Sequence, residues 1–184
     1  MKRVATVLSS AAIALFAISV MAQARLDFSG RWAIEPAQSV AAPGARAGGE
    51  RGGGRMGDMG SGWGSSISIA QDANRLTVEY AFFARGDMQP PLKFVYALDG
   101  SETKNSVMMG RGIQLQTSRT AWEGDKLIIT TIHGFENPAN GQTMNVEVKR
   151  TLSLESPTLL IVETMRSGVL GGPPSTTRTV YRKN

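Results

Sequence analysis

The amino-acid sequence predicts an all-β protein, an antiparallel up-and-down meander of about 8–10 strands closed into a barrel. Apolar residues recur at every second position in most segments after residue 65, which is the period of a β-strand. Short turn signals such as Asp99-Gly100 join these segments, and short connections make consecutive strands antiparallel. A long meander has two exposed edges, and closure into a barrel removes them.

The first 24 residues have the pattern of a signal peptide. Lys2 and Arg3 form a basic start, residues 4–21 are mostly apolar, and Ala22-Gln23-Ala24 is a small-x-small cleavage site. We therefore expect residues 1–24 to be removed and residues 25–184 to form a single barrel domain in the periplasm or outside the cell. An uncleaved membrane anchor is the alternative, but serines and a threonine interrupt the apolar run. We expect no membrane span in the mature chain.

The composition narrows the function classes. The chain has no cysteine, which excludes disulfides and thiolate metal sites. Its net charge of +5 is mild, and the basic residues are dispersed and not interleaved with aromatic ones. We therefore expect no nucleic-acid partner.

The opening strand is predicted over Leu26–Glu35. Phe28, Gly30 and Trp32 fall on one face of it, and Pro36 ends it because proline cannot donate to a strand ladder. Residues 40–64 are rich in glycine and arginine, a composition that buries too little surface to offset the entropy of ordering. We expect a flexible loop here, either a tolerated insertion or a basic arm that recruits an acidic partner.

The remaining strands follow from alternation between turn signals. Residues 101–111 are polar, and we expect them to form a loop. The only histidine, His133, precedes a glycine, and we expect it at the end of a strand. The predicted strands span residues 65–70, 75–83, 91–98, 112–122, 126–133, 142–154, 158–166 and 175–183.

These motifs resemble a known group of barrels. Gly30-x-Trp32 followed by a meander is similar to the calycin group, which comprises lipocalins, fatty-acid-binding proteins and avidins. The motifs of the whole chain more closely resemble a family of exported, lipocalin-like bacterial proteins of unassigned function. The resemblance implies a calycin-like barrel and indicates almost nothing about activity. Its motifs are Phe28-Ser29-Gly30-x-Trp32, Leu98-Asp99-Gly100-Ser101-Glu102, Trp122-Glu123-Gly124-Asp125-Lys126-Leu127 and Val180-Tyr181-Arg182-Lys183.

The sequence departs from the fatty-acid-binding proteins in two respects. The helical lid of fatty-acid-binding proteins is missing, and the glycine-rich loop lies in its position. Arg178 and Tyr181 are three residues apart, so a strand directs them to opposite faces and the carboxylate grip of that family does not carry over. In the calycin group an arginine of the last strand packs over the first-strand tryptophan. The resemblance therefore implies that Arg178 or Arg182 covers Trp32.

The sequence offers little for catalysis. A lone histidine with no serine in a nucleophile-elbow context does not support a triad, and one histidine without cysteines does not make a zinc site. We expect no enzyme activity, no cofactor and no metal. An outer-membrane barrel is disfavoured because charged residues such as Lys93, Glu147 and Lys149 lie on the predicted outer faces.

Ligand binding is the leading hypothesis. Charged residues share strand faces with apolar ones, and ionised groups on an apolar face are costly unless they are paired. We therefore predict that an interior cluster binds the anionic head group of a small hydrophobic or amphipathic ligand, next to an aromatic pocket. The alternatives are that these residues lie at a wet rim, or that the barrel is filled by side chains and serves as an envelope interaction module. The predicted ligand-binding residues are Arg119, Arg150, Glu163, Arg178, Tyr80 and Tyr96.

Overall fold

The computed structural model describes residues 25–39, 62–80, 91–109, 112–136, 141–167 and 174–184. The predicted signal peptide and most of the predicted Gly/Arg-rich loop lie outside these residues. The described residues form ten strands and one short 3-10 helix, η1. Their bounds are β1 Gly30–Ile34, η1 Pro36–Gln38, β2 Ser66–Gln71, β3 Arg75–Tyr80, β4 Leu92–Ala97, β5 Thr103–Met109, β6 Gly112–Glu123, β7 Lys126–Glu136, β8 Thr143–Ser156, β9 Leu159–Arg166 and β10 Ser175–Lys183.

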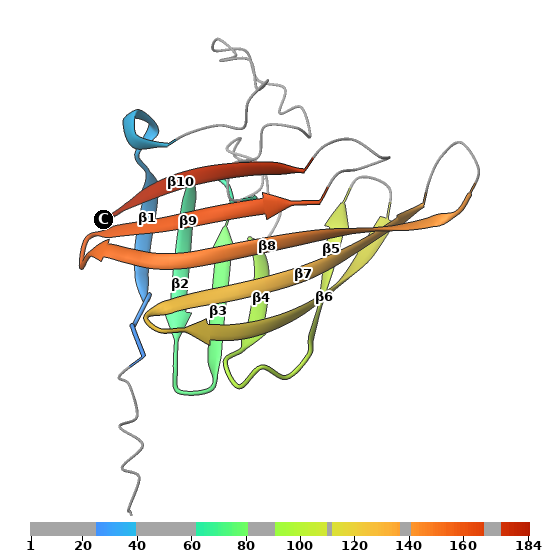
Figure 1. The fold of residues 1–184 in the computed structure, drawn as a ribbon, viewed down its shortest axis with the longest axis horizontal. Coiled ribbons are helices and arrows are strands. Elements are labelled where there is room, and N and C mark those ends of the chain that lie inside the picture. Colours follow the sequence, from blue (N-terminus) through green and yellow to red (C-terminus); the bar gives the residue numbers. More distant parts are fainter. Residues whose placement is uncertain (1–24, 40–61, 81–90, 110–111, 137–140, 168–173) are drawn as a thin grey trace, which may run out of the picture.

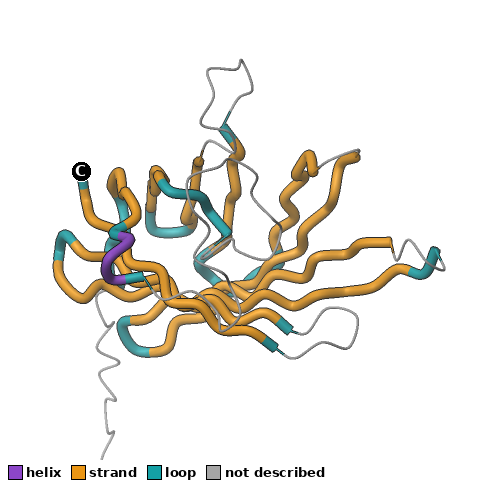
Figure 2. The backbone as a smooth tube through the Cα atoms, turned by 90° about the horizontal axis from the view of Figure 1, so that it is seen from above, coloured by secondary structure: helices purple, strands orange, loops and turns teal. Residues whose placement is uncertain are grey.

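The strands form one antiparallel sheet that wraps into a nearly closed barrel (Figures 1 and 2). The sheet order is β4-β3-β2-β1-β10-β9-β8-β7-β6-β5, so every neighbour is a chain neighbour except β1 and β10. That pair aligns Trp32 with Lys183 and Ile34 with Tyr181, as the predicted opening and closing strands require. The prediction of an all-β antiparallel barrel is confirmed.

The two edges of the sheet, β4 and β5, are joined by side chains. The Asn105 Oδ1 atom of β5 accepts a 2.8 Å hydrogen bond from the Val95 amide of β4, and Asn105 Nδ2 donates one of 3.0 Å to the Val95 carbonyl. Thr120 of β6 donates its hydroxyl proton to the carbonyl of Ala97. The Asn105 side chain thus forms the pair of hydrogen bonds that a backbone residue would form in a strand ladder, and it links the two edges across the seam between β4 and β5.

One prediction about strand content is wrong. Residues 101–111 were expected to form a loop, yet Thr103–Met109 is strand β5, and Asn105 and Val107 in it are buried. The apolar alternation is interrupted because Asn105, at an inward position, bonds the backbone of Val95 instead of packing as hydrocarbon. His133 is likewise not at a strand end, since β7 continues to Glu136.

The interior has an apolar end built around Trp32. Trp32 is fully buried and donates a 3.0 Å hydrogen bond from Nε1 to the carbonyl of Phe28. The ammonium of Lys183, 5.2 Å from the ring centroid, covers it. The predicted covering arginine is therefore wrong: β10 directs Arg178 and Arg182 outward, and the register brings Lys183 beside Trp32. Other fully buried side chains here are Phe28, Leu127, Leu152, Leu160 and Tyr181.

Candidate functional site

Polar side chains occupy the other end of the same strands. Thr177 of β10, Thr164 of β9 and Arg150 of β8 lie next to one another across the sheet, and all three are buried. In the neighbouring interior row, Ser118 and Thr131 share a 2.9 Å hydrogen bond between their hydroxyl groups. The strands therefore direct mainly hydrocarbon inward at one end, and at the other they direct hydrogen-bonding groups together with the buried valines Val146 and Val148.

Arg150 is the centre of this polar end. It is 6% exposed and is the only charged side chain that is buried among the described residues. Its guanidinium carbon lies 5.2 Å from the centroid of the Trp63 ring, a cation–π arrangement that partly compensates a desolvated cation. Trp63 is itself buried, so the end of the predicted 40–64 loop packs into the barrel at this point.

A row of aromatic rings extends from Trp63 along β4 and β3. The Trp63 and Tyr96 centroids are 6.4 Å apart, those of Tyr96 and Phe94 6.5 Å, and those of Phe94 and Tyr80 5.7 Å. The last two pairs are nearly parallel. Burial raises the pKa of Tyr80 to about 12 and also raises the pKa of Tyr96, although the charge of Arg150 acts against both shifts. Both phenols are therefore neutral at physiological pH.

Arg166 lies near Arg150, and the charges of both arginines act on His133. A methyl group built on Gly62 would be 2.9 Å from Arg150 Nη2 and 3.5 Å from Arg166 Nη2, so both guanidinium groups contact the same glycine. Burial, followed by the charges of Arg150 and Arg166, lowers the pKa of His133 to about 4. Burial and the charge of Arg150 also lower the pKa of Arg166. His133 is neutral at pH 7, beside two cations.

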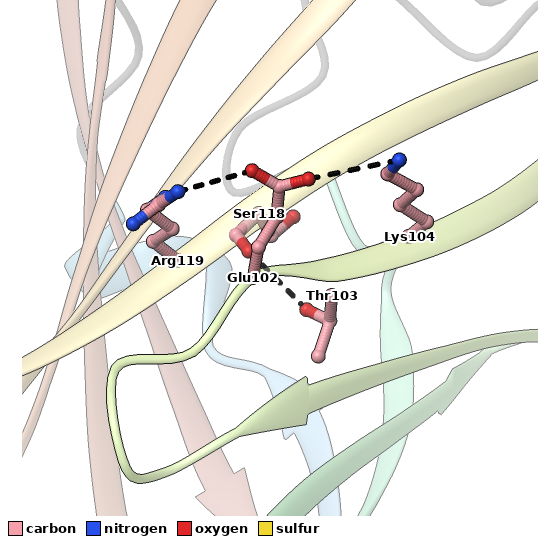
Figure 3. A network of polar contacts seen from close by, with 5 residues as sticks. All are labelled: Glu102, Thr103, Lys104, Ser118 and Arg119. Carbon is pink, nitrogen blue, oxygen red and sulfur yellow. Dashed lines mark hydrogen bonds and ion pairs between the residues drawn. The ribbon is translucent and has the colours of Figure 1, made fainter.

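The four charged residues of the predicted cluster do not come together. Only Arg150 lies inside. Arg119 is on the outer surface, where Nη2 is 3.2 Å from Glu102 Oε2 (Figure 3). Glu163 is exposed, and Arg178 pairs at 3.7 Å with Glu155 outside the barrel.

These placements correct the predicted faces of three strands. The inward face of β9 carries Leu160, Val162 and Thr164, and that of β10 carries Thr177, Thr179 and Tyr181. Glu163 and Arg178 alternate with these residues and therefore lie on the opposite face. The apolar neighbour of Arg119, Leu115, is 52% exposed. By contrast, Tyr80 and Tyr96 both lie inside, near the charge of Arg150.

Sequence reasoning missed Trp63, His133, Thr164 and Arg166. A signal for two of them was present: Leu160, Val162, Thr164 and Arg166 form one alternating set, and the structure buries the first three. The same holds for His133, which follows Leu127, Ile129 and Thr131 at every second position of β7. Trp63 had no such signal, because it lies in the glycine-rich segment.

Comparisons with known proteins add no family. No protein-family model matches the chain, and no curated protein has a significantly similar sequence. The described residues contain no group of three or more histidine and carboxylate side chains able to hold a metal ion, and none of their helices is long and apolar enough to cross a membrane. The fold and the site define a nearly closed ten-stranded antiparallel barrel with a cationic, polar end to its interior.

Proposed function

We propose that this protein is an exported, non-enzymatic barrel that binds a small apolar or amphipathic molecule in its interior. The observation that carries the proposal is the buried Arg150, with Trp63 on one side and polar groups around it. A buried charge costs several kcal/mol of desolvation free energy, and hydrocarbon would fill a purely structural barrel at lower cost. Retention of this charge therefore favours a role in recognition.

The cellular location is part of the proposal. The basic, apolar and small-x-small pattern of residues 1–24 supports export to the periplasm or the exterior. The motifs beginning with Gly30-x-Trp32 support kinship with exported lipocalin-like barrels, and the antiparallel meander agrees with it.

The chemistry of His133 supports binding over catalysis. A general base works best with a pKa near the working pH, and an acidic partner usually orients it. Here burial, followed by the charges of Arg150 and Arg166, lowers the pKa of His133 to about 4. A histidine in this field is a weak base.

A second function is favoured by the apolar end. Trp32, Phe28 and Leu152 are fully buried there, as in a barrel filled by its own side chains. If the whole interior is filled in this way, the protein is an envelope interaction module that acts through its surface and its glycine-rich loop.

Native mass spectrometry separates the two functions. The protein is purified from its own cell envelope and measured before and after denaturation. The binding proposal predicts a stoichiometric small molecule that leaves on denaturation. An apo mass, with no uptake of lipids or other apolar compounds offered afterwards, would contradict it and favour the interaction module.

A further inference from the structure

A buried nitrogen of the single histidine lacks a hydrogen-bond partner. His133 Nε2 is one of three buried side-chain atoms in this state among the described residues. The other two lie elsewhere: Trp122 Nε1 is at the apolar end beside Leu127, and Thr164 Oγ1 is two strands and four residues away in the β7–β8–β9 register. Buried polar atoms are normally satisfied, so the state of His133 requires an explanation.

The cross-strand neighbours of His133 carry no charge. The register places His133 between Gln116 of β6 and Val146 of β8, and both of these side chains are buried. Gln116 lies opposite Asn105 of β5, which is also buried and bonds the Val95 backbone. The wall around the imidazole thus consists of amide and hydrocarbon groups, which suit an uncharged ligand group better than an ionised one.

The imidazole is itself neutral at pH 7. Burial, followed by the charges of Arg150 and Arg166, lowers the pKa of His133 to about 4. A neutral imidazole has one N–H donor and one acceptor nitrogen, and Nε2 is either of them according to the tautomer. A hydroxyl group both donates and accepts, so it can bond Nε2 in both tautomers.

His133 lies at the rim of the continuous wall. The β6–β7 register begins at the pair of Gln116 and His133, although β6 starts earlier, at Gly112, and β7 continues to Glu136. Beyond this pair, the described part of β6 pairs with β5 alone and that of β7 with β8 alone. The wall therefore divides into two hairpins beside the imidazole.

The wall also leads from the imidazole to the aromatic row. Asn105 joins β5 to Val95 of β4, and Val95 lies between Phe94 and Tyr96 in that strand. The rings of Tyr80, Phe94 and Tyr96 are nearly parallel. From β4 to β7 there are three strand spacings, about 14 Å along the wall, and the curvature of the sheet shortens the direct path. A planar body of two or three rings has this scale.

We infer that His133 binds the ligand, and that the ligand is an uncharged planar molecule of two or three rings whose hydroxyl group bonds His133 Nε2. The rings would lie against Phe94 and Tyr80 of the aromatic row, and Gln116 and Val146 would flank the hydroxyl group. This inference rests on the proposed function and specifies its ligand class.

The first experiment compares three probes that share one two-ring body. Biphenyl has no polar group, 4-phenylphenol adds a hydroxyl that is neutral at pH 7, and biphenyl-4-carboxylate adds a charge. The untagged protein should bind 4-phenylphenol about three- to tenfold more tightly than biphenyl, the factor expected for one neutral hydrogen bond. The carboxylate should bind more weakly than the phenol, because an uncharged pocket does not compensate the desolvation of an anion.

NMR spectroscopy locates the hydroxyl group. Because the chain has only one histidine, the imidazole nitrogen signals of the untagged protein report on His133 without ambiguity. 4-Phenylphenol should shift the Nε2 signal, whereas biphenyl should leave it nearly unchanged.

Variants then assign the preference to the imidazole. His133→Phe keeps a ring and removes both nitrogens, so it should bind 4-phenylphenol and biphenyl equally. Unchanged affinity for biphenyl shows that this variant is folded. The matched control is Thr120→Val, which removes a buried hydroxyl that already bonds the carbonyl of Ala97. It should keep the preference for 4-phenylphenol.

Each other outcome overturns a defined part of the account. Equal affinity of the unaltered protein for biphenyl and 4-phenylphenol would overturn the hydroxyl site and leave the binding barrel standing. A preference that survives in His133→Phe would overturn the role of His133. Tighter binding of the carboxylate than of the phenol would overturn the uncharged ligand class. Binding of lipids but of none of the three probes would overturn the planar class alone. Binding of no compound offered would contradict the proposed function itself.

Discussion

The two ends of the barrel interior are built from the same strands with opposite chemistry. Along β8, Leu152 lies at the apolar end and Arg150, two residues earlier, at the polar end. Along β9, Val162 and Thr164 make the same change. Both ends are buried, so burial alone does not explain the difference. The comparison teaches that the apolar end supplies stability, whereas the burial of Arg150 at the polar end costs stability, a cost that the proposed ligand binding would explain.

The largest effect is expected from truncation at the apolar end. Leu152→Ala removes a fully buried side chain and should lower the free energy of unfolding by about 2–5 kcal/mol, from lost burial and the cavity left behind. Urea unfolding measures it. A loss of unfolding free energy below about 1 kcal/mol would contradict the comparison, because the apolar end would then not be tightly packed.

Acid should weaken the polar end. Burial and the charges of Arg150 and Arg166 lower the pKa of His133 to about 4 in the folded protein, whereas the unfolded chain titrates near 6.5. The unfolded state therefore binds more protons between these values. The contribution of neutral His133 to the free energy of unfolding is complete above pH 6.5 and is lost as pH falls toward 4. Because the ring is only partly buried, solvent screening keeps the loss below about 3 kcal/mol.

Urea unfolding from neutral pH down to pH 4 measures this loss. The control is His133→Gln, which should flatten the pH dependence within that window. An unchanged slope in the variant would show that other groups, such as surface carboxylates, cause the acid sensitivity.

The hydrogen bonds across the seam between β4 and β5 should contribute less to the free energy of unfolding than the side chains at either end of the interior. Asn105→Ala removes both side-chain hydrogen bonds to Val95 and should cost about 1–2 kcal/mol. Hydrogen exchange at the Val95 amide should accelerate. The matched control, Lys104→Ala, alters an exposed neighbour and should change stability by no more than about 0.5 kcal/mol. Unchanged exchange at Val95 would mean that the seam is held by other contacts.

The smallest effect is expected where a hydroxyl lacks a partner among the described residues. Thr164→Val replaces an unsatisfied buried hydroxyl and should change stability by less than about 1 kcal/mol, or raise it. Thr131→Val is the control, because its hydroxyl bonds to Ser118, and it should cost about 1 kcal/mol. A larger loss for Thr164→Val than for Thr131→Val would show that Thr164 serves the fold and not a ligand.

The fold was largely predictable from the sequence because alternation and turn chemistry are local. The pairing of β1 with β10 followed from the meander, and Asp99-Gly100 was correctly predicted as a turn. Strand β5 was missed because its inward positions include Thr103 and Asn105, and a buried asparagine that bonds the Val95 backbone has the sequence signal of a loop residue. A period-two pattern of polar residues carries no hydrophobic signal.

The site was predictable only in part, because alternation does not say which face points inward. Glu163 and Arg178 lie on the face opposite the interior one, which carries Leu160, Val162 and Thr164 on β9 and Thr177, Thr179 and Tyr181 on β10. Arg150 was predicted inside because Val146, Val148 and Leu152 mark its face clearly. Arg166 approaches Arg150 because the β8–β9 register pairs Arg150 with Thr164 and Val148 with Arg166, and no local pattern encodes that register.

The most direct test is a high-resolution crystal structure of the protein as purified from its own envelope. The account predicts electron density for a non-protein molecule inside the barrel, beside Arg150 and the aromatic row that begins at Trp63. The contradicting result is a structure in which side chains of the same chain fill the space around Arg150 and no density for another molecule is present.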